Sequence, residues 1–358
     1  MPARLVRLLL VGLGNLGRRF CALLGERQVA LAQRYGLRFL LVGAADSHGA
    51  AERPDGLDLR RVVALKEAGK SIAAYPEVGQ PKRTALGLVR EAEADVLCEA
   101  SPVNLATGGE PGLSCVRAAL ARGMHVVTPN KGPIVLAYPE LVHLARDRGV
   151  ELRFDGTVAG GLPALYLGMR DLRGAVVSRI EAVPNLVTGL LIDRLLAGTS
   201  WEAALAQARR EGQLEADPSW DLDGWDAAAK LVILANAVLG VPARLEDVER
   251  EGITGLTAEG ARRAAGTGLL RLVARAERVT EGSYHLSVRP RALPVDHPLG
   301  RLGTHGMGIV YETDLFGTIA ATISETTPLP SAATILRDLL DIYVGHEDSV
   351  GSDTGPRE

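Results

Sequence analysis

The fold is decided by the stretch Arg4-Leu-Val-Arg-Leu-Leu-Leu-Val11, which runs directly into Gly12-Leu-Gly-Asn-Leu-Gly17. The first part is a short apolar run that predicts a strand, and the helical pattern Arg18–Leu24 follows the glycines. Glycines between a strand and a helix allow a tight turn and let the backbone approach a pyrophosphate, which then sits at the helix N-terminus. This placement predicts a dinucleotide-binding unit, and the alternative is a strand–helix turn without a ligand.

Three further apolar runs predict strands: Phe39–Ala45, Asp95–Ala100 and His125–Thr128. The segment Gly112–Arg122 between the last two has the pattern of a helix. Strands that alternate with helices favour an α/β fold with a Rossmann-type, doubly wound parallel sheet. Ligands of such sheets bind beyond the carboxyl ends of the strands. The residues expected to bind the cofactor are therefore Gly12, Gly14, Asn15, Leu16, Gly17, Asp46, Ser101, Pro102 and Asn130.

Asp46 bears on which dinucleotide is used, because it follows the second predicted strand. An acid at that point can accept hydrogen bonds from the adenosine ribose, which favours NAD over NADP. The spacing from the glycines is longer than usual, Arg53 and Arg60 follow nearby, and Asp46 could equally be a loop residue. The expected cofactor is therefore NAD or NADP, and the choice between them stays open.

The composition excludes several classes of protein. A chain of 358 residues can form two domains with sizeable cores, and a net charge of −3 gives no basic footprint for nucleic acid. No apolar run is long enough to span a membrane, and the N-terminus leads into a strand without a secretory signal. The three cysteines are widely spaced and the histidines are scattered, so neither a disulfide framework nor a metal site is expected. We expect a cytoplasmic protein.

The pattern of elements changes after the first domain. Strand-like runs then follow one another without regular crossover helices, which suggests an α+β domain. We predict a dinucleotide-binding domain over 1–150 and a substrate domain over 151–309. A strand and an amphipathic helix over 310–345 are expected to return to the first domain, and the polar tail 346–358 is expected to be disordered.

The most acidic segment is Glu215-Ala-Asp-Pro-Ser-Trp-Asp-Leu-Asp-Gly-Trp-Asp-Ala-Ala-Ala-Lys230, and it leads into the apolar helical stretch Ala227–Leu239. Asp226 and Lys230 are four residues apart, so they share one face of that helix. A lysine that enters a core is costly unless it meets opposite charge. The arrangement suits a substrate with an amino group and a reacting oxygen. The alternative is a solvated acidic loop with a helical ion pair.

Over roughly residues 5–345 the chain resembles homoserine dehydrogenases, especially the short, unfused kind. The resemblance is carried by Gly12–Gly17, Asp55-Gly-Leu-Asp-Leu59, Val126-Val-Thr-Pro-Asn-Lys-Gly132, Phe154-Asp-Gly-Thr-Val-Ala-Gly-Gly-Leu-Pro163, the acidic segment and Glu312-Thr-Asp-Leu-Phe-Gly317. The acidic segment is the most specific of these, because it fixes four carboxylates, a glycine and a lysine in register.

The resemblance implies a Rossmann domain joined to a dimerising substrate domain, and hence a homodimer. It implies interconversion of L-homoserine and L-aspartate 4-semialdehyde, a small amino-acid substrate, with NAD or NADP. Lys230 and Lys131 match the two active-site lysines, and Asp226 matches an aspartate beside the reacting hydroxyl. Glu215 and Asp221 match substrate-binding acids. Which lysine moves the proton stays open, and Lys131 taken alone could be a surface loop residue.

Three departures from the family pattern lie on the substrate side. Pro184-Asn-Leu-Val-Thr188 stands where an Asn-Gly-Thr turn is usual, Gln213 where a tyrosine is common, and Ser324-Glu-Thr-Thr-Pro328 where a glycine-rich turn is frequent. Two alternatives therefore stay open. One is a dehydrogenase for another short amino alcohol or aldehyde, and the other is a dinucleotide-binding homologue without turnover.

Overall fold

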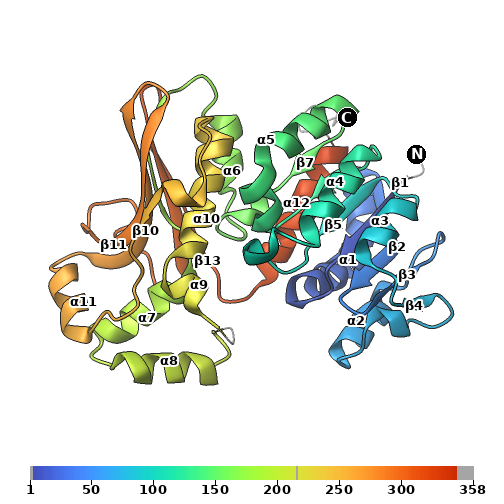
Figure 1. The fold of residues 1–358 in the computed structure, drawn as a ribbon, viewed down its shortest axis with the longest axis horizontal. Helices are drawn as coiled ribbons and strands as arrows, with labels where there is room; N and C mark the ends of the chain where they lie inside the picture. Colours follow the sequence, from blue (N-terminus) through green and yellow to red (C-terminus); the bar gives the residue numbers. More distant parts are fainter. Residues whose placement is uncertain (1–2, 215–216, 345–358) are drawn as a thin grey trace, which may run out of the picture. The chain divides into compact units, whose positions relative to one another are not determined.

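The computed structural model describes residues 3–214 and 217–344, which fall into two compact units (Figure 1). The chain up to Gly156, together with the part from Leu329 onward, forms the first unit. The second unit is Thr157–Pro328. None of the helices in these described residues is long and apolar enough to cross a membrane.

The first unit is built on a seven-stranded sheet of order β4-β3-β2-β1-β5-β6-β7. Its strands are β1 Arg4–Val11, β2 Leu37–Asp46, β3 Gly49–Glu52, β4 Gly79–Pro81, β5 Val96–Glu99, β6 His125–Val127 and β7 Leu152–Arg153. Its helices are α1 Asn15–Tyr35, α2 Leu59–Glu67, α3 Ala85–Glu91, α4 Gly112–Ala121, α5 Lys131–Arg148 and α12 Leu329–Tyr343, with 3₁₀ turns at Ile72–Ala74, Leu105–Thr107 and Asp155–Thr157. β2, β1, β5, β6 and β7 are parallel, while β3 and β4 add an antiparallel edge. The expected Rossmann-type sheet is confirmed.

The last helix of the chain completes the core of this unit. Ile335 and Leu339 of α12 are fully buried in the same cluster as Leu10 of β1 and Phe20 of α1. A buried carboxylate fixes the same helix, because Asp155 pairs with Arg337. α12 therefore packs into the first unit.

Two strand assignments from the sequence are wrong. β7 pairs with β6, with Val126 opposite Leu152, so the run that begins at Leu152 belongs to the first unit and not to the substrate domain. β12 (Gly306–Thr313) is hydrogen-bonded on both sides within the second unit, so the expected strand near residue 310 does not accompany α12. An apolar pattern predicts that a strand is buried but does not name its neighbours. The tail predicted to be disordered, 346–358, lies outside the described residues.

The second unit contains a six-stranded sheet of order β13-β12-β8-β10-β11-β9 (Figure 1). Its other strands are β8 Val177–Val183, β9 Val248–Arg250, β10 Leu269–Thr280, β11 Ser283–Leu293 and β13 Gly317–Ser324. Its helices are α6 Ala164–Tyr166, α7 Leu186–Leu196, α8 Trp201–Arg210, α9 Ser219–Leu222, α10 Trp225–Leu234 and α11 Ala258–Ala265, with π-helical turns at Leu167–Asp171 and Ala235–Leu239 and a 3₁₀ turn at Leu245–Asp247. All pairings are antiparallel except β11 with β9. The predicted α+β character is present.

Candidate active site

The turn after β1 requires glycine at two positions. Gly12 has φ +92°, and a Cβ placed there would lie 2.3 Å from the carbonyl carbon of Ala100. A Cβ on Gly17 would lie 2.0 Å from the carbonyl oxygen of Gly12. The first contact brings the turn against the end of β5, and the second brings the start of α1 against the turn. Close backbone packing explains both residues without reference to a ligand.

Gly14 is different, because a Cβ placed there would meet nothing within 4 Å. It is the N-cap of α1, no side chain caps that end, and the first turn holds no acidic residue. The N–H groups that open a helix have no partner within it and carry a partial positive charge. Open space beside such a terminus fits a dinucleotide pyrophosphate held by Gly14, Asn15 and Leu16.

Asp46 ends β2 as predicted, but its carboxylate is engaged by the protein itself. It accepts from Lys66 Nζ at 2.7 Å, Ser71 Oγ at 2.8 Å, Ile72 N at 2.9 Å and His48 N at 3.0 Å. Burial opposes ionisation, yet these hydrogen bonds outweigh it and lower the pKa of Asp46. A carboxylate has about four acceptor sites. The ribose contact stays a prediction, and it requires one of these donors to move.

Glu99 is a buried acid that was not predicted as a site residue, and its hydrogen bonds join the ends of β5 and β6. Glu99 is fully buried, and it accepts from Ser101 N at 2.9 Å and from Thr128 Oγ1 at 3.2 Å. Burial raises its pKa, although hydrogen bonds from Ser101, Asn130 and Thr128 work in the opposite direction. A glutamate that closes the apolar run Val96–Glu99 was the signal available in the sequence.

Asn130 links this acid to the first candidate lysine. Its Oδ1 accepts the N–H of Gly132 at 2.9 Å and so caps α5, whose first residue is Lys131. Its Nδ2 donates to Ser101 Oγ at 3.3 Å. Ser101 and Asn130 are thus brought together, whereas Pro102 is exposed beside them.

The acidic segment divides into two groups. Asp217 accepts the N–H of Ser219 at 3.0 Å, and Asp223 accepts from Thr254 Oγ1 at 2.6 Å. Asp217 thus holds its own turn, and Asp223 ties the segment to Thr254. Asp221 and Asp226 instead converge on a single side chain. Glu215, predicted to bind substrate, lies outside the described residues.

Lys230 and Asp226 form the expected pair on α10. Lys230 Nζ donates to Asp226 Oδ2 at 2.7 Å and to the carbonyl oxygen of Pro184 at 2.6 Å. The side chains are only 12% and 5% exposed. A solvated acidic loop would not bury both charges, so that alternative does not describe the pair.

Asn185 is a residue of this site that the sequence reading did not assign. Its Nδ2 donates to Asp221 Oδ1 at 2.7 Å and to Asp226 Oδ2 at 2.8 Å. Its Oδ1 accepts the N–H of Thr188 at 3.0 Å and caps α7. The departing segment Pro184–Thr188 is therefore the start of a helix, with Leu186 and Val187 in its first turn.

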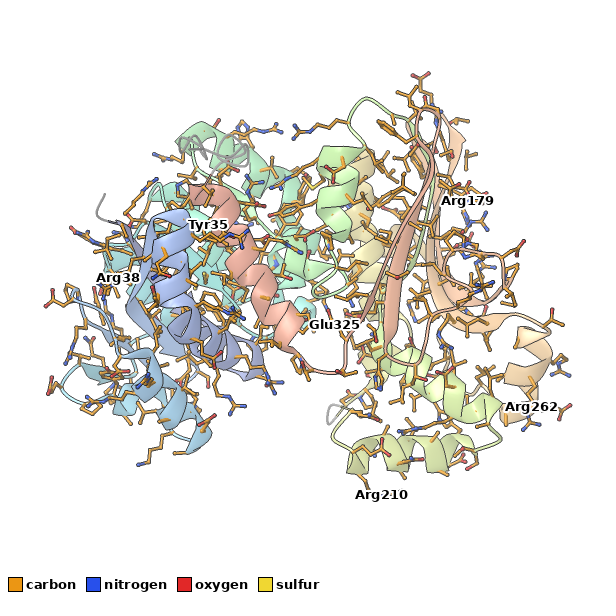
Figure 2. The ribbon with its side chains drawn as sticks, turned by 180° about the vertical axis from the view of Figure 1, so that it is seen from behind. Tyr35, Arg38, Arg179, Arg210, Arg262 and Glu325 are labelled. Carbon is orange, nitrogen blue, oxygen red and sulfur yellow. The ribbon has the colours of Figure 1, made fainter. Side chains whose placement is uncertain are left out.

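Glu325, labelled in Figure 2, lies in the departing segment Ser324–Pro328, and the charge of Lys230 acts on it. It is 6% exposed and accepts the N–H of Gly161 at 2.6 Å. Burial raises its pKa, while the Gly161 N–H and the positive charge of Lys230 lower it. The second unit thus gathers several acids and one ammonium group.

The structure brings together the glycine turn, Ser101 and Asn130 in the first unit, and Asp221, Asp226 and Lys230 in the second. Lys131 belongs to the first unit and Lys230 to the second. A dinucleotide-binding sheet combined with a buried lysine–aspartate pair defines an NAD(P)-dependent dehydrogenase.

The comparisons with known proteins name the family. Residues 163–340 match the family model described as homoserine dehydrogenase. A homoserine dehydrogenase of Methanocaldococcus jannaschii is 34% identical over 94% of this chain and 98% of the relative. The chain belongs to the homoserine dehydrogenase family, whose members are NAD(P)-dependent oxidoreductases acting on a CH–OH group.

Other relatives extend the comparison to the cofactor and the fold. An NAD(+)-dependent homoserine dehydrogenase of Pseudomonas canavaninivorans is 31% identical over 94% of this chain and 96% of the relative. A structure described as a putative homoserine dehydrogenase from Archaeoglobus fulgidus matches with TM-score 0.83 and 33% identity, covering 95% of this chain and 100% of that one. A hyperthermophilic archaeal homoserine dehydrogenase in complex with NADPH matches with TM-score 0.81 and 27% identity, covering 95% and 98%. The expectation of NAD or NADP is confirmed for the family.

Proposed function

We propose that this protein interconverts L-homoserine and L-aspartate 4-semialdehyde with NAD or NADP as the hydride carrier. The observation that carries the proposal is the buried ammonium group of Lys230, held by Asp226 and the Pro184 carbonyl. Family membership supplies the reaction class, and the open terminus of α1 beside Gly14 fits the dinucleotide.

Oxidation of the alcohol carbon requires the hydroxyl proton to leave together with the hydride. The nicotinamide, when bound, accepts the hydride. Lys230 moves the proton, which a lysine can do when burial or a second cation brings its pKa towards the working pH. In the reverse direction the ammonium polarises the aldehyde carbonyl and protonates the forming alkoxide.

The other residues orient the lysine and bind the substrate. Asp226 orients Lys230, Lys131 supplies the second cation, and Asp221 together with Glu215 binds the substrate ammonium by charge-assisted hydrogen bonds. An exchange of roles between the two lysines is the alternative. It predicts that Lys131→Met lowers turnover more than Lys230→Met.

One observation favours a different short amino alcohol as substrate. Leu186 and Val187 occupy the first turn of α7, next to Asn185, where the family usually has small residues. Both side chains are larger than the usual glycine and threonine, and they lack the threonine hydroxyl donor. A spectrophotometric assay at 340 nm over a panel of amino alcohols, with both cofactors, decides between the substrates. Cofactor binding without turnover of any alcohol would overturn the dehydrogenase proposal.

We also propose that two copies pair through one face of the second sheet. The register places Arg179, Glu181, Arg275, Glu277, Arg289 and Arg291 on that face, which therefore carries charges of both signs. Arg179 is labelled in Figure 2. A second copy of the same face would offer further carboxylates to the accessible ends of these arginines.

Light scattering after size exclusion tests the homodimer. Arg275→Glu is expected to yield a folded monomer, while the matched control Arg278→Glu, which alternates to the other face of β10, keeps the dimer mass. A monomeric wild-type protein would refute the pairing. A cytoplasmic location is proposed with this function and is tested by cell fractionation.

A further inference from the structure

Both polar atoms of the Asn185 side chain make hydrogen bonds. One end, Oδ1, caps α7 through the N–H of Thr188. The other end, Nδ2, has two hydrogens and donates to a carboxylate oxygen of Asp221 and to one of Asp226. The residue is 7% exposed, so water does not compete freely for these contacts.

The two acids served by this amide have different neighbours. Asp226 Oδ2 accepts from both Asn185 and Lys230, and Asp226 is 4% exposed. Asp221 is on α9, and the Asn185 amide is hydrogen-bonded to both acids. Two carboxylates that converge on one nitrogen repel each other, and repulsion of this kind drives one of them to take up a proton or turn away.

We infer that Asn185 is a positioning residue of the catalytic centre, which holds Asp221 and Asp226 ionised and correctly turned at the same time. The inference rests on the proposed function for its kinetic consequence. Asp226 keeps Lys230 in place, and Asp221 keeps an oxygen oriented for the substrate ammonium. The polar atoms of Asn185 are engaged by protein groups, so it acts through these two acids.

Helix capping alone does not account for an asparagine at this position. Asp, Ser and Asn cap helices about equally well, because each offers an oxygen to the first free N–H groups. Only asparagine combines that oxygen, at that length, with two N–H donors on the same side chain. The choice of asparagine is therefore explained by the acids.

Two variants separate the capping role from the positioning role. Asn185→Ser and Asn185→Asp both retain a capping oxygen, but the first removes the two donors and the second replaces them with a third carboxylate. If positioning matters, kcat/KM for homoserine falls ~10- to 10²-fold in Asn185→Ser, the range for losing hydrogen bonds to charged groups, and further in Asn185→Asp. KM and kcat both change, since one acid serves binding and the other orients Lys230, while the Kd of the dinucleotide stays at the wild-type value.

We expect kcat/KM to be highest for the wild-type asparagine, lower for serine and lowest for aspartate at position 185. Capping alone would give similar kcat/KM values for all three residues. Wild-type kinetics in both variants would overturn the inference. Equal losses in Asn185→Ser and Asn185→Asp that parallel their fall in Tm would overturn it as well, because they would reduce Asn185 to a capping residue.

A double-mutant cycle tests the bridge without any substrate. The unfolding free energies of Asn185→Ser, Asp221→Asn and the double variant are expected to be non-additive, because the residues share a hydrogen bond. Additive effects would overturn the bridge. Non-additive effects in a protein that turns over no amino alcohol would instead overturn the proposed function, and with it the kinetic role of Asn185.

Discussion

Replacing Lys230 by methionine removes the ammonium group and keeps most of the apolar stem. The structure predicts two separate consequences of this substitution. The variant loses the donor to Asp226 and to the Pro184 carbonyl, both made by an atom on a side chain that is 12% exposed. It also loses the proton carrier of the proposed reaction.

The stability effect follows from the carboxylate left behind. Breaking a buried ion pair by removing one partner costs ~3–5 kcal/mol. Asp226 keeps the hydrogen bond from Asn185, so the lower end, about 3 kcal/mol, is expected. For a unit of this size that corresponds to a fall in Tm of roughly 6–12 °C. Adding Asp226→Asn removes the stranded charge and should recover much of that loss.

The kinetic effect does not recover with stability. Loss of a general acid–base lowers turnover by ~10²–10⁴, and Asp226→Asn cannot restore a proton carrier. The assay is kcat at saturating homoserine, followed at 340 nm below the melting range of each variant, with dinucleotide affinity unchanged. Near-wild-type turnover in Lys230→Met would refute the reasoning and leave Lys230 as a structural partner of Asp226.

Arg83→Met is a matched control. Arg83 is 14% exposed and pairs with Glu52 and Glu91 in the first unit, whereas Lys230 belongs to the second. It should lower Tm without lowering kcat. If it lowers both in the same proportion, the loss in Lys230→Met reports stability and not proton transfer.

Three further predictions concern the cofactor, the substrate and the pH dependence of stability. Asp46→Ser removes a negative charge and releases the Lys66 ammonium, so the ratio of kcat/KM for NADP to that for NAD should rise; an unchanged ratio would place the choice of cofactor elsewhere. Restoring glycine at Leu186 and threonine at Val187 opens space and adds a donor worth ~0.5–1.5 kcal/mol, which should lower KM for homoserine by up to about tenfold. Unchanged or abolished activity would mean that the turn has been rebuilt around a different pocket. Burial raises the pKa of Glu99, so the folded state binds its proton more tightly than the unfolded state, and wild-type stability falls as the pH rises from about 4.3, the ordinary glutamate value, through the raised value. In melting curves, the Tm of Glu99→Gln relative to that of the wild type should therefore be higher at pH 8 than at pH 5. A difference in Tm between the two proteins that does not change with pH would contradict this.

The sequence predicted those features that depend on local order along the chain. The turn Gly12–Gly17 lies between β1 and α1 as expected, and the four-residue spacing of Asp226 and Lys230 produced the ion pair on α10. Both depend on neighbours within a few residues, so periodicity and spacing carry the information.

Features that depend on distant partners were not predictable in the same way. Three of the four donors to Asp46 come from Lys66, Ser71 and Ile72, which follow it by 20, 25 and 26 residues. Asn185 meets acids that follow it by 36 and 41 residues. Which strand pairs with β7 or β12 likewise depends on the whole sheet, and the apolar pattern of a strand does not identify its partner.

The placement of α12 sets the order in which this chain can fold. The first unit needs Ile335 and Leu339 to close its core, and Tyr343 packs edge-on against Phe39 and His125. Ribosomes add ~5–20 residues per second, so the ~170 residues between the two parts of this unit take ~10–35 s to synthesise. During that interval the apolar face that α12 covers in the folded unit stays exposed, until the final helix emerges.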